Sequence, residues 1–190
     1  MEAFLVSTGL VAIAEIGDKT MLLAIVLAAA WRKPLPIIVG IMLATLANHA
    51  LAALAGSLAS QWLAGPWMRW IIGIAFLGFA AWALVPDKLE EDEGRPKSGP
   101  KTALGVVWAT AVAFFLVEMG DKTQVATAAL GAQFTHIAPV VAGSTLGMMI
   151  ANIPAVYLGE AAATRLPLKW IRMAAAAGFA LTGLWVLIAG

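Results

Sequence analysis

The chain contains no cysteine and few charged residues. Of its 190 residues none is Cys, 12% are charged and 62% are hydrophobic. Without cysteine the chain has no disulfide, no thiolate metal site and no cysteine nucleophile. The low charge content and a mean hydropathy of +0.89 exclude an ordinary soluble domain and are typical of a polytopic membrane protein.

Several other features are missing as well. No Lys or Arg precedes the first apolar stretch, where a secretory signal peptide carries a basic segment. We therefore expect the first helix to remain in the mature protein. No nucleophile–base pair or cofactor motif is visible, so we expect neither an enzyme nor a prosthetic group. The expected partner is the lipid bilayer, with no nucleic acid, and a homo-oligomer is left open.

Six apolar stretches are long enough to cross a bilayer, which takes roughly 20 helical residues. The predicted spans are about 3–30, 35–60, 67–85, 102–131, 137–159 and 169–189. Residues 86–101 are charged and contain Pro and Gly, which indicates a solvated linker. The sequence therefore predicts an all-α polytopic membrane protein with six transmembrane helices.

The basic residues of the predicted loops are distributed unevenly. Loops 1–2, 3–4 and 5–6 lie on one side of the membrane. They carry Arg32, Lys33, Lys88, Arg95, Lys97, Lys101, Arg165, Lys169 and Arg172. The other side carries only Arg69. Because basic loops stay in the cytoplasm, we expect both termini outside and the linker 86–101 inside.

The chain repeats itself at a spacing of 103 residues. The phrase EIGDKT at 15–20 returns as EMGDKT at 118–123, and Pro36, Gly40, Trp67 and Trp82 are also repeated at this spacing. The sequence thus predicts two three-helix repeats, 1–85 and 102–190. Since three is odd, the second repeat enters the membrane from the opposite side, as in the inverted repeats of many transporters.

Each repeated phrase places two acids and a lysine in the middle of an apolar span. Ionisable groups inside a membrane are costly and are generally functional. Residues three apart share a helix face, which predicts that the acids of each copy point the same way. Two-fold symmetry brings the two pairs to one site. We therefore predict that four carboxylates bind a metal ion: Glu15, Asp18, Glu118 and Asp121.

This set of ligands suits a hard divalent cation such as Ca²⁺ or Mn²⁺, because every donor is oxygen. Metal binding must displace protons from carboxylates, which couples cation movement to proton counter-movement. Further candidates for ligands or for coupling are Lys19, Thr20, Lys122, Thr123, Gln124, Asn48 and Asn152. Gly17 and Gly120 are expected to unwind the helix locally.

Two alternatives remain at this point. The scaffold could export a small organic cation or an amino acid instead of a metal. The motif could also be a self-satisfied ion pair in a non-transporting membrane assembly factor. Replacement of the glutamates by glutamine separates these possibilities, because only a carboxylate-based exporter loses its flux.

The paired E-x-G-D-K-[TS] motifs in the first and fourth of six helices resemble those of a family of cation/proton antiporters. This family includes Golgi and chloroplast manganese/calcium transporters and bacterial MneA-type manganese exporters. The resemblance covers nearly the whole chain, and neither copy departs from the motif. It implies export of Mn²⁺ or Ca²⁺, or both, in exchange for protons. Without an organellar transit segment, the chain looks like a bacterial member located in the plasma membrane.

Overall fold

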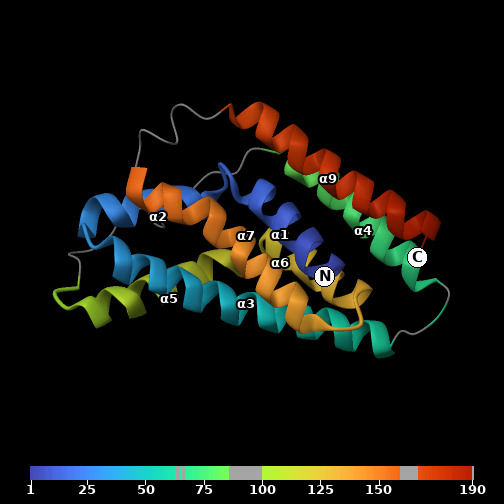
Figure 1. The fold of residues 1–190 in the computed structure, drawn as a ribbon, viewed down its shortest axis with the longest axis horizontal. Helices are drawn as coiled ribbons and strands as arrows, with labels where there is room; N and C mark the ends of the chain where they lie inside the picture. The colour runs from blue at the N-terminus through green and yellow to red at the C-terminus, as the bar shows by residue number, and fades with distance from the viewer. Residues whose placement is uncertain (63–64, 66, 86–99, 159–166, 190) are drawn as a thin grey trace.

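The computed structural model describes residues 1–62, 65, 67–85, 100–158 and 167–189 (Figure 1). These residues form eight α-helices and no strand. Most of the predicted linker, 86–101, lies outside the described residues. The architecture is therefore all-helical in the part of the chain that can be described.

Two of the predicted spans are each interrupted in the structure. The sequence predicts one helix over 3–30, where the chain forms α1 (Glu2–Glu15) and α2 (Lys19–Trp31). It likewise predicts one helix over 102–131, where α5 (Ala103–Glu118) and α6 (Lys122–Gln133) are found. Gly17 and Gly120 have φ angles of +84° and +78°. Such angles end a right-handed helix, and glycine adopts them without the steric cost of a side chain.

The other predicted spans correspond to single helices. They are α3 (Pro34–Trp62), α4 (Met68–Ala83), α7 (Ile137–Leu158) and α9 (Leu168–Ala189). By length and composition α3, α7 and α9 can each cross a membrane. The pair α5–α6, bent by 75°, makes a fourth candidate when it is counted as one span. The helices α2 and α4 are apolar but shorter.

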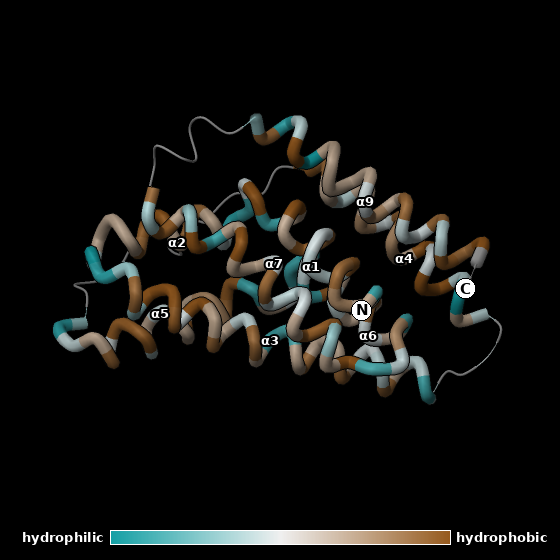
Figure 2. The backbone as a smooth tube through the Cα atoms, in the orientation of Figure 1, coloured by the Kyte–Doolittle hydropathy of each residue, from teal (hydrophilic) through white to brown (hydrophobic). Residues whose placement is uncertain are grey.

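Hydrophobic side chains cover the outside of the molecule, and many polar ones lie inside. Leu5, Ile74 and Leu181 are more than half exposed, and apolar residues run along most of the helices, with α6 the more polar exception (Figure 2). Among the fully buried side chains are Glu15 and Glu118. This is the reverse of a soluble protein, and it fits a protein whose outer surface faces lipid.

The buried hydrophobic residues form two clusters. One is built from α2, α3, α5 and α7. The other is built from α1, α3, α4, α6, α7 and α9. Each interrupted span therefore contributes one helix to each cluster: α2 and α5 belong to the first, and α1 and α6 to the second. The breaks at Gly17 and Gly120 lie where the clusters meet.

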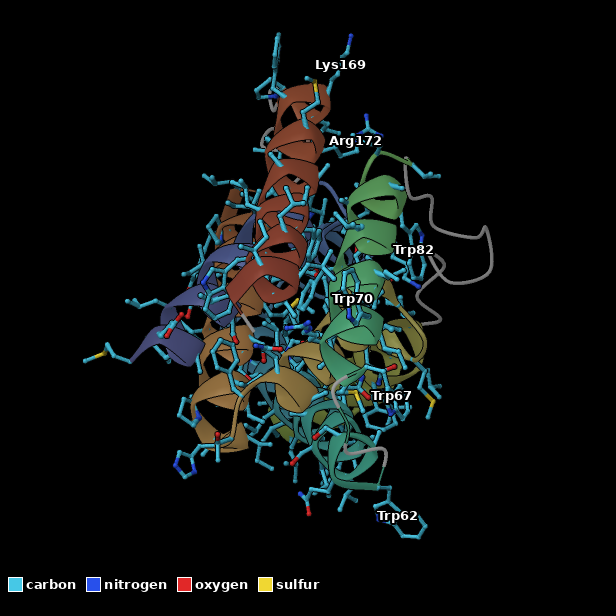
Figure 3. All side chains as sticks on the ribbon, turned by 90° about the vertical axis from the view of Figure 1, so that its right-hand side faces the viewer. Trp62, Trp67, Trp70, Trp82, Lys169 and Arg172 are labelled. Atoms are coloured by element: carbon cyan, nitrogen blue, oxygen red, sulfur yellow. The ribbon has the colours of Figure 1, made fainter. Side chains whose placement is uncertain are left out.

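Helices α4 and α9 form a closely packed pair, seen side by side in Figure 1. Phe76, Phe79 and Phe179 pack together between them, with ring centroids 5.8 to 6.4 Å apart; Phe76 and Phe179 are stacked, and Phe79 meets both edge to face. The pair packs against α1 and α6, whereas neither α2 nor α5 has a comparable interface with it in the described residues. Lys169 and Arg172, near the start of α9, lie at the opposite edge of the molecule from Trp62, the last residue of α3 (Figure 3).

Candidate metal centre

The acidic residues of both motifs lie at helix ends. Glu15 is the last residue of α1 and Asp18 is the N-cap of α2, so the two do not share a helix face as the spacing predicts. Glu118 and Asp121 occupy the same positions in α5 and α6. The C-terminal end of a helix carries a partial negative charge, which attracts cations. The breaks therefore place each glutamate at a helix C-terminus, where the helix end and the carboxylate both attract a cation.

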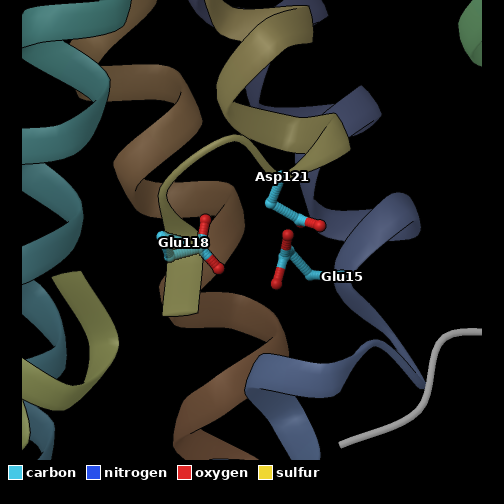
Figure 4. Close-up of side chains that lie close together, drawn as sticks. All are labelled: Glu15, Glu118 and Asp121. Carbon is cyan, nitrogen blue, oxygen red and sulfur yellow. The ribbon is translucent and has the colours of Figure 1, made fainter. Parts of the chain in front are cut away.

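Three of the four predicted carboxylates converge. Oxygen atoms of Glu15, Glu118 and Asp121 all lie within 4.8 Å of one another. Figure 4 shows these side chains pointing toward one another from the α1, α5 and α6 ends of the breaks. All three are buried, with Asp121 the most exposed at 4%. This is the only group of three or more acidic, histidine or cysteine ligands in the described part of the chain.

The lysines form ion pairs with the opposite motif. Lys122 Nζ lies 2.9 Å from Asp18 Oδ1, and Lys19 Nζ lies 3.5 Å from Asp121 Oδ1. The first pair is almost fully buried, whereas Lys19 keeps 21% of its side chain exposed. The fourth carboxylate, Asp18, is thus held by a lysine beside the group of three.

The threonines of the motifs donate hydrogen bonds to the glutamates. Thr20 Oγ1 donates to Glu15 Oε2 at 2.6 Å. Thr123 Oγ1 lies 3.4 Å from both Glu118 Oε2 and Asp121 Oδ2. The second oxygen of each glutamate, Oε1, is buried and accepts no hydrogen bond from any described residue. Buried acceptors are normally satisfied, so these two atoms are available to a cation or a proton.

The amide side chains predicted as further ligands have different surroundings. Gln124 and Asn48 bond to each other beside the second break, with Nε2 and Oδ1 3.2 Å apart. Asn152 is buried and donates to the Met148 carbonyl of its own helix at 3.0 Å. Sequence reasoning missed Met21, whose sulfur accepts a hydrogen bond from the Gly17 N–H at 3.4 Å. The only signal was that Met21 stands where Gln124 stands in the second copy.

The charges and donors of the centre match a divalent cation. Four carboxylates and two lysines leave a formal charge of about −2 when all are ionised, which one divalent ion neutralises. The atoms that could bind a metal are carboxylate and hydroxyl oxygens, the ligands that Ca²⁺ and Mn²⁺ prefer. A polyacid site between two halves of a membrane protein can bind such an ion and exchange it for protons.

Comparison with known proteins shows which family the chain belongs to. The family described as "Divalent cation/proton antiporter GDT1" matches residues 3–91 and 106–190. A protein of Vibrio cholerae named "Putative manganese exporter" is 45% identical over 185 residues, which cover 97% of this chain and 90% of the relative. A GDT1-like protein of Synechocystis is 29% identical over 189 residues, covering 91% and 90% of the two chains. No solved structure matches the chain. The chain belongs to the GDT1 family of divalent cation/proton antiporters, and is a multi-pass membrane transporter rather than an enzyme.

Proposed function

We propose that this antiporter exports Mn²⁺ from the cytoplasm in exchange for protons, and that Glu15, Glu118 and Asp121 bind the ion in the conformation described above. The observation that carries the proposal is the convergence of these three buried carboxylates from both motifs within 4.8 Å. The manganese assignment draws on the name of the Vibrio cholerae relative. Ca²⁺ is the second candidate, because the donors are all hard oxygen ligands.

The proposed architecture is six spans in two inverted repeats. The equivalent elements are α1 with α5, α2 with α6, α3 with α7 and α4 with α9, each pair 103 residues apart in the sequence. Both broken helices have glycine at positive φ in the same place, which supports a common origin of the two halves. The loop charges support outward-facing termini in a bacterial plasma membrane. In this orientation α1 and α6 form the extracellular halves of their spans, and α2 and α5 the cytoplasmic halves.

The conformation described above is proposed to be open to the cytoplasm. In the described residues the α4–α9 pair packs on the extracellular halves α1 and α6 and has no comparable interface with α2 or α5. A Cβ at Gly17 would contact Leu168 of α9, whereas one at Gly120 would meet no atom within 4 Å. Lys19, at the start of α2, is also more exposed than Lys122 at the start of α6. Exchange of the two packings, with α4 on α5 and α9 on α2, would open the other side.

The aspartates are proposed to alternate between the two conformations. Asp121 lies in the group of three and is paired loosely with Lys19, whereas Asp18 is paired closely with Lys122. When the repeats exchange roles, Asp18 takes the place of Asp121, and both glutamates stay in the site. The glutamates would therefore bind the cation throughout the cycle, and each aspartate in one conformation only.

Flux into proteoliposomes under an imposed pH gradient tests this function. We expect Mn²⁺ to move in the direction opposite to the protons. Mg²⁺ should be transported much more slowly, because it dehydrates reluctantly and demands near-ideal octahedral geometry. The variant Glu118→Gln keeps the shape of the side chain and removes its charge. Parental Mn²⁺ flux in this variant, or flux of an organic cation without any metal flux, would contradict the proposal.

A further inference from the structure

The break in the second copy deprives two backbone groups of their helical partners. The Met119 N–H donates to the Leu116 carbonyl at 3.2 Å, so the Phe115 carbonyl loses the donor that a continuous helix would supply. The Gly120 N–H lies in the turn that follows, where no helical acceptor is left for it. Inside a membrane such groups must be satisfied by the protein itself.

Two amide side chains from other helices satisfy both groups. Asn48 Nδ2, from α3, donates to the Phe115 carbonyl at 3.1 Å. Gln124 Oε1, from α6, accepts from the Gly120 N–H at 2.7 Å. Gln124 Nε2 then donates to Asn48 Oδ1 at 3.2 Å. The three bonds form one chain that fastens the end of α5 to α3 and α6.

The first copy has the same backbone without this chain of bonds. The residue after α1, Ile16, has φ and ψ of −67° and 113°, close to the −62° and 117° of Met119. The Gly17 N–H bonds only the softer sulfur of Met21, at 3.4 Å. At the position equivalent to Asn48 stands Ala151, which has no amide to offer. The two breaks therefore share a shape but differ in how they are held.

We propose that Asn48 and Gln124 are positioning residues that fix the second break, and with it Glu118 and Asp121 on either side of the turn. This inference rests on the proposed function, because it assumes that these two acids bind the cation. Ligands that are fixed in advance lose less freedom when the ion binds and accommodate ions of other sizes less well. The first break, where the Gly17 N–H bonds a thioether instead of an amide oxygen, is the half of the site that adjusts.

The test is Mn²⁺ transport by Gln124→Ala, measured in proteoliposomes as KM and maximal rate per folded protein. We expect KM to rise about tenfold, the effect of losing one or two hydrogen bonds inside a membrane, while the maximal rate changes less than about twofold. Competition by Ca²⁺ should become stronger. The control Gln61→Ala removes an amide that bonds Ser57 at the exposed end of α3, and should keep the parental KM.

A double-mutant cycle shows whether the two amides act together. Asn48→Ala should also raise KM, and Asn48→Ala with Gln124→Ala should be no worse than Gln124→Ala alone, since residues of one network are not additive. Independent effects that multiply would overturn the proposal. A parental KM in Gln124→Ala would also overturn it. A lower yield of this protein with an unchanged KM would show that Gln124 matters only for folding.

The glutamate variant separates this inference from the proposed function. If Glu118→Gln abolishes flux while Gln124→Ala keeps the parental KM, the site stands and the positioning role is wrong. If Glu118→Gln transports Mn²⁺ normally, the site itself is wrong and the positioning role falls with it.

Discussion

Lys122 of the second motif lies 2.9 Å from Asp18 of the first, measured from Nζ to Oδ1. The reciprocal pair, Lys19 with Asp121, is longer at 3.5 Å and partly exposed. Each motif thus supplies the counter-ion for an acid of the other. An ion pair confined to one motif would stabilise one repeat alone, whereas these pairs join the two repeats across the centre.

The fully buried pair should matter more for stability than the partly exposed one. Removing one partner of a buried pair leaves an uncompensated charge and costs about 3–5 kcal/mol, and this cost falls as a side chain reaches solvent. We expect Lys122→Met to lower the melting temperature in detergent more than Lys19→Met does. Asp18→Asn combined with Lys122→Met should recover much of the loss. Equal effects of the two lysine variants would contradict the observed difference in burial.

The two motif glycines should differ in their tolerance of alanine. Both have positive φ, where a side chain costs about 1–2 kcal/mol. A Cβ at Gly17 would also collide with Leu168, whereas the space at Gly120 is open. Gly17→Ala should therefore lower thermal stability more than Gly120→Ala, and adding Leu168→Ala should remove the difference. Identical melting curves for the two single variants would show that α9 does not cover the first break.

The proposed exchange of packing can be followed with cysteine pairs, because the parent chain has no cysteine. A Cβ at Gly178 would lie 3.0 Å from Leu10 Cδ2, so Leu10→Cys with Gly178→Cys should cross-link in the described conformation. The cross-linked protein should not transport, because α9 is held on α1, and reduction of the cross-link should restore transport. The equivalent pair in the other halves is Ala113→Cys with Ala75→Cys.

This second pair should cross-link only when Mn²⁺ and a pH gradient drive the cycle, because α4 and α5 have no substantial interface in this conformation. Failure of the Ala75–Ala113 pair to form under turnover would argue against exchange of the α4–α9 packing. Parental transport by the cross-linked Leu10–Gly178 protein would argue against it equally.

Much of this arrangement follows from sequence patterns. Hydropathy predicts segments that coincide closely with the observed helices, such as 35–60 for α3 (Pro34–Trp62). The spacing of 103 residues predicts equivalent positions for Glu15 and Glu118, and both side chains lie in the group of three. Apolar runs and repeated motifs are local properties of the chain, so they can be read without a fold.

Other features depend on long-range contacts and could not be predicted. The glycines indicate local unwinding, but the helical spacing used for the acids places Glu15 and Asp18 on one face, whereas they lie on two separate helix ends. The pairing of Lys122 with Asp18 requires the two repeats to meet, and no local pattern specifies it. The same holds for Asn48 and Gln124, because the sequence of a span does not distinguish an amide that binds an ion from one that bonds a backbone group.

The central claim is that carboxylates from both motifs bind the cation and exchange it for protons. The most direct measurement follows Mn²⁺ and proton movement together in proteoliposomes, for the parent and for Glu15→Gln combined with Glu118→Gln. The parent should move protons opposite to Mn²⁺, with an apparent Mn²⁺ affinity that weakens as pH falls, because protons compete for the carboxylates. The double variant should lose both fluxes, at least about a hundredfold. Coupled Mn²⁺ and proton movement at the parental rate in that variant would contradict the account.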